Sequence, residues 1–457
     1  MKNKRILKGK VSTTKILAFG FLTAIILGGL ILMLPISSAD GSFSSITDAF
    51  FTSTTSVCVT GLVTVPTYAH WNVFGQIVIT ILSQIGGLGV ITFTTLFFMM
   101  LGKKITLKDR LVLMDAYNLD SMEGLSFVVK RIVKGTLVVE LVGALIYMTV
   151  FIPEFGISGI WKSIFNAIAA FCNSGMDILG PDSLAPYVSN PIVSINTMLL
   201  IVVGGIGFPI WWSTIELIKI RRKSRHIFKM RLLSIPLHNK IVLFSTFALI
   251  LSGAILVFVL EYGNPNTLGN LSIGEKIQAA FFQSITTRTA GFYTISQSGL
   301  CQSTATICCI LMFIGGSPAG TAGGVKTTTI FVLLATTIAI IKGKKDTEIF
   351  HRKIKDDTVR SAISIFSVSF VILIIAVVAL TITENGNMLD SLYEATSAIA
   401  TVGLTRDYTT SLSLIGKWII IITMYLGRIG PISIALLFNT SKKPKLIRYP
   451  KEDVHVG

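Results

Sequence analysis

The chain of 457 residues is 51% hydrophobic but only 14% charged, and its mean hydropathy is +0.73. Soluble domains carry about 25% charged residues, so this composition excludes a soluble enzyme and predicts a protein with many segments in a lipid bilayer. The formal net charge of +17 is gathered in separate basic stretches between apolar ones, which indicates membrane topology and argues against nucleic acid as a partner.

The basic stretches recur along the whole chain. They hold 33 of the 40 lysines and arginines and lie at residues 2–15, 103–134, 219–240, 342–360 and 442–451. Loops on the cytoplasmic side of a membrane carry an excess of Lys and Arg. The pattern therefore predicts a multi-pass protein of the plasma membrane with both termini in the cytoplasm.

The first apolar stretch, Ile16–Leu34, follows the basic N-terminus. It is longer than the roughly 7–15 apolar residues of a cleaved signal peptide. Comparable stretches recur at Leu137–Ile152, Ile241–Leu260 and Ala362–Ile382, each near the length of about 20 residues that a spanning helix needs. We therefore expect the first stretch to be retained as a membrane helix.

A short segment that ends in glycine and a large apolar residue occurs four times. The four glycines are separated by 114, 116 and 112 residues, and an aromatic residue stands ten positions before each. The pairs are Phe51 with Gly61, Phe165 with Gly175, Phe281 with Gly291, and Tyr393 with Gly403. Such a near-constant period indicates four copies of one structural unit.

A second, glycine-rich marker follows each segment after about 25–30 residues. The four markers are Ile85–Gly89, Val203–Gly207, Ile314–Pro318 and Leu426–Gly430. The predicted unit is therefore a helix, the short segment with its glycine, and a second helix that contains a glycine-rich break.

The short segments are about 12 residues long, which is too short and too polar to span a bilayer. We expect each to enter and leave the membrane on the same side, between two spanning helices. The predicted fold is all-α, with eight spanning helices and four re-entrant pore half-helices around a pseudo-fourfold pore. The expected repeats are residues 1–110, 111–230, 231–350 and 351–457, and the last includes a cytoplasmic tail.

Four equivalent segments around one axis would form a pathway for a cation. Inward-pointing backbone carbonyls can replace the hydration shell of a cation, and the carbonyl ends of the half-helices would make the cavity below them negative. The alternative, glycines that pack two helices together, is typical of long apolar helices. Because the four glycines lie in polar loops, we interpret the segments as a selectivity filter.

With this repeated helix–pore–helix unit, its single-glycine filters and a glycine-rich break in the third repeat, the chain resembles the Trk/Ktr/HKT superfamily of cation transporters. It most closely resembles the membrane subunit of bacterial Ktr potassium uptake systems, from about Lys15 to Tyr449. The resemblance implies potassium uptake without a bound cofactor, with backbone carbonyls as ligands. The implied filter residues are Val59, Thr60, Gly61, Asn173, Ser174, Gly175, Thr289, Ala290, Gly291, Thr401, Val402 and Gly403.

The filter sequences bear on cation selectivity. None of them has the Thr-Val-Gly-Tyr-Gly run of tetrameric potassium channels, which predicts weaker selectivity against sodium. Plant relatives that prefer sodium have serine where this chain has Gly61, which favours potassium here. A sodium-selective or poorly selective transporter of the same fold remains the alternative, and sodium remains a candidate activator.

The second helix of the third repeat is interrupted by five glycines and a proline within the ten residues 315–324. These residues disfavour a regular helix. A nucleotide-binding P-loop is excluded because the spacing before Lys326 misses that motif by one residue. We expect a flexible loop at 315–329, and in the family that the chain resembles such a loop obstructs the path. The predicted gate comprises Gly315, Gly316, Gly320, Gly323, Gly324, Lys326 and Arg428.

Two of these gate residues are cations in an apolar zone, where an unpaired charge costs about 2.5–3.5 kcal/mol. Arg428 is in register with Gly87, Gly205 and Gly316 of the other repeats, so we expect it to line the constriction and to limit conduction. Lys326 is expected to face protein or water, with snorkelling to the cytoplasmic face as the alternative.

One filter-proximal position, three residues before each glycine, carries unusual side chains. Cys58 and Cys172 occupy it in the first two repeats, where we expect symmetry-related packing rather than a metal site or a disulfide. In the third repeat Arg288 stands there. It could damp the negative potential of the cation path or bond a carboxylate such as Glu394, and we expect a structural, anchoring role.

The chain has no nucleotide fingerprint, so regulation would need another chain. The resemblance implies a homodimer and a cytosolic ring of Rossmann-type, nucleotide-binding subunits, although the basic loops could equally contact anionic lipid. An alternating-access carrier would use acidic coupling residues, and Glu140 is the clearest candidate; we expect it to bond within the bundle instead. The five scattered histidines do not form the cluster that a membrane enzyme requires.

Overall fold

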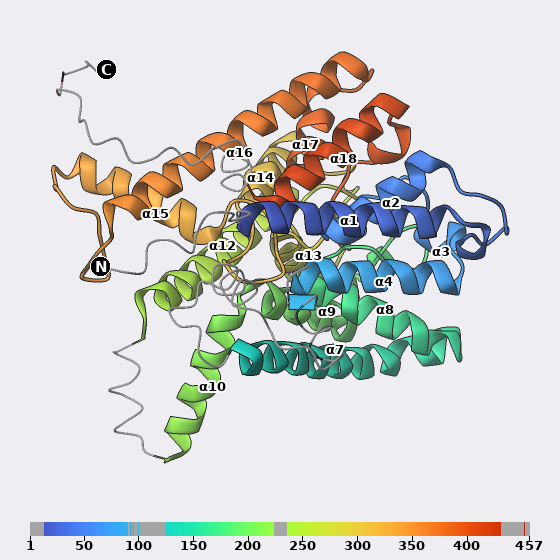
Figure 1. Ribbon diagram of the computed structural model, residues 1–457, viewed down its shortest axis with the longest axis horizontal. Coiled ribbons are helices and arrows are strands. Elements are labelled where there is room, and N and C mark those ends of the chain that lie inside the picture. The colour runs from blue at the N-terminus through green and yellow to red at the C-terminus, as the bar shows by residue number, and fades with distance from the viewer. Residues whose placement is uncertain are drawn as a thin grey trace, which may run out of the picture.

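A computed structural model of the chain describes residues 13–89, 92, 93, 95, 99, 125–223, 235–430 and 452. These residues are almost entirely helical (Figure 1). One hairpin, β1 (Glu348–Ile349) with β2 (Arg352–Lys353), joins two of the helices. Much of the basic stretches and the expected repeat boundaries near residues 110 and 230 lie outside the described residues.

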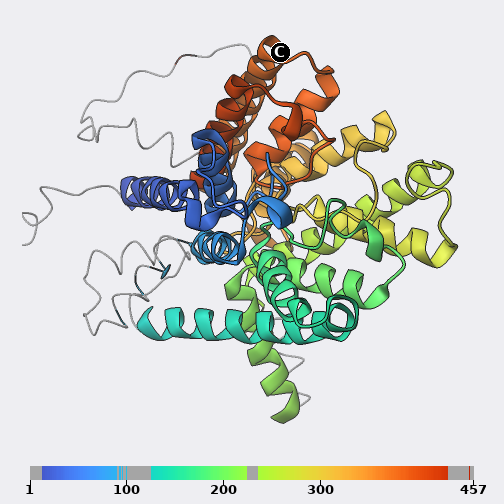
Figure 2. The same ribbon diagram turned by 90° about the vertical axis from the view of Figure 1, so that its right-hand side faces the viewer.

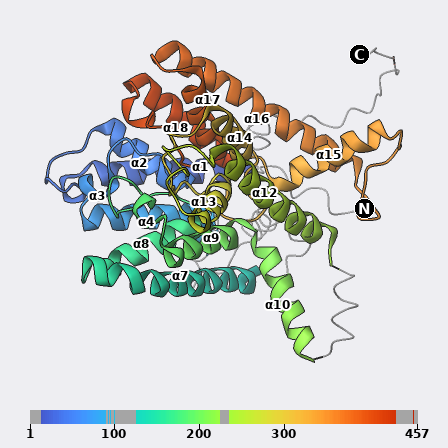
Figure 3. The same ribbon diagram turned by 180° about the vertical axis from the view of Figure 1, so that it is seen from behind.

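Among the residues that the structure describes, four helices are long and apolar enough to cross a bilayer. They are α1 (Thr13–Met33), α7 (Leu125–Phe155), α12 (Leu237–Glu261) and α16 (Asp356–Thr383). They contain the four apolar stretches that the sequence predicts, except for Leu34, which follows the end of α1. A fifth candidate is the pair α9 (Pro191–Gly205) and α10 (Phe208–Lys223), which bends by 102° at its break, so that α10 projects away from the other helices (Figure 3).

Each long helix is followed by one of four short helices, which pack against it. These are α2 (Ile46–Cys58), α8 (Ser158–Cys172), α13 (Ile273–Thr286) and α17 (Met388–Ala400). Their C-terminal halves lie at the centre of the molecule and are buried although several of their residues are polar, such as Thr54, Ser56 and Ser397. Polar side chains at a protein centre indicate a function beyond packing.

A second helix follows each short helix. These second helices are α4 (Val73–Leu88), α9, α14 (Gln302–Phe313) and α18 (Leu414–Ile429). Three start at a side-chain cap: Asn72, Asn190 and Ser413 each accept a hydrogen bond from a backbone N–H of the first turn. These caps satisfy N–H groups that a helix leaves free at its start.

The four groups of helices occupy successive sectors around a common centre when the molecule is viewed end-on (Figure 2). After the second helix of the third group, the chain passes through a loop at residues 314–326 and continues as α15 (Thr327–Ile341). The loop therefore lies between two helices of the same group, where the sequence predicts an interruption.

Candidate functional site

Each short helix ends in a turn that sequence reasoning did not predict. A residue that is not glycine adopts a left-handed conformation two positions before each repeated glycine. The φ angles are 56° at Val59, 60° at Asn173, 70° at Thr289 and 52° at Thr401. Outside glycine this conformation is unfavourable by about 1–2 kcal/mol, so its fourfold occurrence indicates that the turn is required.

The chain continues from these turns into the four repeated glycines, which form a closed ring. A Cβ atom on Gly61 would lie 2.5 Å from the carbonyl oxygen of Ser174 in the next repeat. The same relation links Gly175 to Ala290 at 2.5 Å, Gly291 to Val402 at 2.6 Å, and Gly403 back to Thr60. The structure thus brings all four predicted segments together, and only glycine fits where each meets its neighbour.

Backbone N–H groups in the first, second and fourth glycine segments point back into the short helices. The N–H groups of Thr60, Ser174 and Val402 donate to carbonyl oxygens five residues earlier, at 2.8, 2.7 and 2.8 Å. The N–H groups of Gly61 and Gly403 donate to the hydroxyls of Thr55 and Ser397, at 2.9 and 3.0 Å. The donors of the segments are therefore occupied on the side away from the ring.

The carbonyl oxygens of the glycine segments differ from their N–H groups in hydrogen bonding. No backbone N–H among the described residues donates to the carbonyl of any of the twelve predicted filter residues, all of which are buried. Buried carbonyl groups are nearly always paired in proteins. The four segments that meet at the ring therefore hold twelve buried acceptors without such a donor.

A cavity of about 460 Å³ lies against one side of the ring. All four repeated glycines line it, together with Asp177, Asp182 and Asp407. Burial raises the pKa of Asp177 to about 6, although hydrogen bonds to its carboxylate oppose the shift. We call this cavity the outer vestibule; three carboxylates give its wall a negative charge above that pKa.

The second helices touch the ends of the short helices through the predicted glycine markers. Gly86, Gly204 and Gly427 lie so close to the carbonyl oxygens of Val57, Phe171 and Ile399 that a Cβ would overlap them. Each of these carbonyls stands four residues before a repeated glycine. In the third repeat the corresponding Gly315 instead packs against Gly323 of the 314–326 loop.

The 314–326 loop is folded against the end of α9 and is held by hydrogen bonds. The N–H groups of Ser317 and Thr321 donate to the carbonyls of Gly205 and Gly204, at 3.0 and 3.1 Å. The N–H of Gly315 donates to the carbonyl of Val325 at 2.9 Å, which closes the base of the loop. The glycines make these close backbone approaches possible.

The two predicted gate cations bind backbone carbonyls. The Arg428 guanidinium donates to the carbonyls of Thr321 at 2.8 Å and Gly86 at 2.5 Å, which joins α18, the loop and α4. Lys326 Nζ donates to the carbonyl of Ala322 at 2.7 Å, within the loop, and so does not snorkel away.

Both cations line a second cavity of about 360 Å³, which we call the inner cavity. Of the predicted gate glycines, Gly320, Gly323 and Gly324 line it too, whereas Gly315 and Gly316 are packed within the protein.

Arg288 does not take the partner that the sequence suggested. The Glu394 carboxylate accepts hydrogen bonds from Thr405 at 2.7 Å and Thr409 at 2.5 Å, and the buried Arg288 Nε has no hydrogen-bond partner among the described residues. The expected Arg288–Glu394 bond is therefore wrong, because threonines on the segment after the fourth glycine satisfy the carboxylate.

Cys58 and Cys172 are buried free thiols. Glu140 accepts a hydrogen bond from Gln84 at 2.5 Å, so it is bonded within the bundle as expected.

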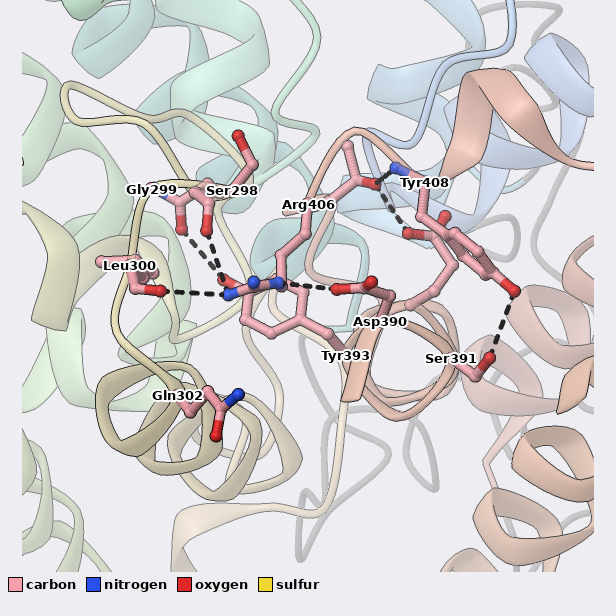
Figure 4. A network of polar contacts seen from close by, with 12 residues as sticks. Ser298, Gly299, Leu300, Gln302, Asp390, Ser391, Tyr393, Arg406 and Tyr408 are labelled. Carbon is pink, nitrogen blue, oxygen red and sulfur yellow. Dashed lines mark hydrogen bonds and ion pairs between the residues drawn. The ribbon is translucent and has the colours of Figure 1, made fainter. Parts of the chain in front are cut away.

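Polar contacts around Arg406 hold the segment that follows the fourth glycine (Figure 4). Arg406 Nε donates to Asp390 of α17 at 2.8 Å, and its Nη1 donates to the carbonyl of Leu300 in the third repeat at 3.4 Å. A second ion pair, Lys417 with Asp48 at 2.9 Å, joins the fourth repeat to the first. Neighbouring repeats are therefore connected around the vestibule by charged side chains.

Comparisons with known proteins agree on one family. The TrkH family, described as a cation transport protein, matches residues 20–449. The chain is 40% identical to the Ktr system potassium uptake protein B of Bacillus subtilis, over 100% of this chain and 99% of the relative. It is 37% identical to the potassium/sodium uptake protein NtpJ of Enterococcus hirae, over 99% of both chains.

A solved structure supports the fold. The crystal structure of the potassium transporter TrkH from Vibrio parahaemolyticus matches with a TM-score of 0.75, covering 96% of this chain and 87% of that one at 16% identity. At this identity the match bears on the fold alone.

The Arg406 network yields a stability prediction. The Arg406 and Asp390 side chains are 14% and 22% exposed, and Asp390→Asn would leave the guanidinium without its charged partner. We expect the free energy of unfolding in mild detergent to fall by about 1–3 kcal/mol. The matched control is Glu348→Gln in the exposed Lys344–Glu348 pair, where we expect less than about 1 kcal/mol. Equal losses in the two variants would contradict the structural role of the network.

Proposed function

The chain belongs to the TrkH family of cation transport proteins and is a transporter rather than an enzyme; on this premise we propose that it takes up potassium across a bacterial plasma membrane. The pathway is channel-like, and the carbonyls of the four glycine segments are the ligands of the transported ion. The observation that carries this proposal is the closed ring of buried carbonyls that accept no backbone hydrogen bond among the described residues.

The names of the relatives favour potassium over sodium as the transported ion. Ktr system potassium uptake protein B is the name of relatives in both Bacillus subtilis and Vibrio alginolyticus, at 40% and 35% identity. The NtpJ relative is named for potassium and sodium, which keeps a less selective transporter, or activation by sodium, as the second candidate.

The proposed membrane topology has eight spans and four re-entrant short helices, with both termini in the cytoplasm. Four long helices support half of these spans directly. The second helices α4 and α18 have 16 residues each, about 24 Å at 1.5 Å per residue, which is most of the thickness of a bilayer core. The four repeats would then be residues 1–110, 111–230, 231–350 and 351–457.

The 314–326 loop, with Lys326 and Arg428, is the proposed gate. The loop lies between the glycine segments and the inner cavity, because Gly323 packs against Thr401 of the fourth segment and also lines the inner cavity. Opening requires Arg428 to release the Thr321 carbonyl, or the loop to move with it. In this proposal the hydrogen bond from Arg428 to the Thr321 carbonyl holds the loop closed, and we call this contact the lock. A separate regulatory subunit would drive the loop open.

Two partners follow from the same family argument. We propose a homodimer and a cytosolic regulatory ring of nucleotide-binding subunits, which would contact the basic stretches. The relatives' name, protein B of a Ktr system, supports a system of more than one protein.

Substitution of Gly61 tests the filter. In potassium-loaded liposomes that contain the purified chain, we expect Gly61→Ala to reduce rubidium-86 uptake at least tenfold, because its Cβ would collide with the Ser174 carbonyl. Gly41→Ala is the matched control, since Gly41 also has a positive φ, of 71°, but has open space around it. Potassium-dependent thermal stabilisation gives a second measurement that does not need an open gate. Undiminished uptake and stabilisation in Gly61→Ala would refute the filter assignment.

Removal of the Arg428 side chain tests the gate. Arg428→Ala breaks the links from α18 to the loop and to α4, so we expect faster rubidium-86 uptake than in the unmodified chain. Lys326→Met is compared with it, since Lys326 bonds only within the loop and should have the smaller effect. An unchanged rate and cation dependence in Arg428→Ala would contradict the lock.

External pH tests the outer vestibule. Protonation of Asp177 below its pKa of about 6 removes a negative charge beside the ring, so we expect uptake to fall as external pH drops through this range. Asp177→Asn should abolish that step. Asp40→Asn is the control, because hydrogen bonds from Ser38 and Ser42 lower the pKa of Asp40 to about 2 and keep it charged throughout. A pH step that survives in Asp177→Asn would assign it to another group.

A further inference from the structure

Thr321 occupies the point where the 314–326 loop meets the glycine segments. Its backbone N–H donates to the carbonyl of Gly204 at 3.1 Å, and its own carbonyl accepts the hydrogen bond from Arg428. Its hydroxyl donates to the carbonyl of Phe171, at the end of α8, at 3.1 Å, and lies 3.4 Å from Asn173 Oδ1. Thr321, which is fully buried, thus contacts the second helix α9, the short helix α8 and the Arg428 side chain.

Asn173 differs from the three residues that occupy the same position in the other repeats. Those are Val59, Thr289 and Thr401, so Asn173 carries the single amide of the set. Its Nδ2 donates to Thr289 Oγ1 at 3.4 Å, while its Oδ1 faces Thr321. The side chain therefore bridges the second and third glycine segments on one side and the loop on the other.

The contacts of this amide are long, which makes its orientation easy to change. Hydrogen bonds between such groups are usually about 2.7–3.2 Å long and weaken beyond that range. The Thr321 hydroxyl also has one hydrogen, which the Phe171 carbonyl and Asn173 Oδ1 must share. If the loop withdraws, both acceptors lose this donor together, although neither belongs to the loop.

We propose that Thr321 is a positioning residue that couples the state of the loop to the cation preference of the ring, acting through Asn173. With the loop closed, its hydroxyl holds the Asn173 amide and the last turn of α8 in the arrangement seen here. With the loop open, the amide is free to reorient and the second glycine segment adjusts its carbonyls. This inference rests on the proposed filter and gate, and it makes selectivity a property of the gate state.

Three single variants test the coupling. Thr321→Val keeps the shape and removes the hydroxyl, Thr321→Ser keeps the hydroxyl, and Ser317→Ala is the matched control. The Ser317 hydroxyl lies on the same loop and is also buried, but it contacts Thr327 Oγ1 at 3.3 Å rather than a glycine segment. Rubidium-86 and sodium-22 uptake into liposomes are measured for each, and their ratio is the selectivity.

We expect Thr321→Val to raise uptake and to change the rubidium-to-sodium ratio at least threefold. Thr321→Ser should restore the ratio, and Ser317→Ala should alter the rate without altering the ratio. The concentrations of potassium and of sodium that give half-maximal thermal stabilisation provide the same ratio without flux. An unchanged ratio in Thr321→Val by both measurements, or an equal change in Ser317→Ala, would overturn the proposal.

A double variant separates this proposal from the filter assignment on which it rests. Asn173→Val copies the residue of the first repeat, and in that background Thr321→Val should cause no further change in the ratio. Additive changes would show that Thr321 does not act through Asn173. If Gly61→Ala abolishes cation-dependent stabilisation while Thr321→Val leaves the ratio intact, the filter assignment stands and the coupling alone fails.

Discussion

The close approach of each repeated glycine to the carbonyl of the next repeat is the constraint on which the rest of the structure depends. A Cβ on any of these four glycines would meet a neighbouring backbone oxygen, and in each case the neighbour belongs to the following repeat. The ring therefore exists only if all four segments arrive in the same conformation. That requirement explains the left-handed residue two positions earlier in every copy, despite its unfavourable conformational energy. It also explains why polar residues fill the ends of the short helices, since their hydroxyls hold the N–H groups of Gly61 and Gly403 away from the ring.

Departures from this fourfold regularity are concentrated on one side of the ring. In three repeats the second helix approaches its short helix through a glycine, whereas in the third repeat Gly315 turns toward Gly323 and the chain forms a loop. In the fourth repeat Arg428 replaces a marker glycine and bonds two carbonyls that the loop and α4 present. The two irregular features are thus in direct contact. An ion pathway without a gate would need neither feature, so we expect the loop and Arg428 to control transport.

The sequence predicted the elements that depend on local pattern. The long apolar helices, the short segments of about a dozen residues and the position of the break in the third repeat all follow from hydropathy and from glycine spacing. The convergence of the four glycines was predicted because a repeat at constant spacing implies equivalent places in space. The left-handed turns were not, since Val, Thr and Asn give no local signal for a positive φ that tertiary contacts impose. The partners of Glu394 were also not predicted. Arg288 of the neighbouring repeat was expected to bond this carboxylate, but Thr405 and Thr409, which are closer along the chain, satisfy it without a buried cation. The way in which the glycine-rich loop packs was not predicted either: the Ser317 and Thr321 backbones bond the end of α9.

Arg428 and Lys326 bind carbonyls rather than carboxylates, and this choice has a mechanical consequence. A buried ion pair holds its partners firmly because separating two charges in a medium of low polarity is costly. A guanidinium on backbone carbonyls is satisfied by hydrogen bonds that water in the inner cavity can replace as the loop moves. Both cations line the inner cavity. If the ion follows the proposed path through this cavity, repulsion of the ion and attachment of the loop lie in the same side chains, and a displacement of Arg428 would relieve both together.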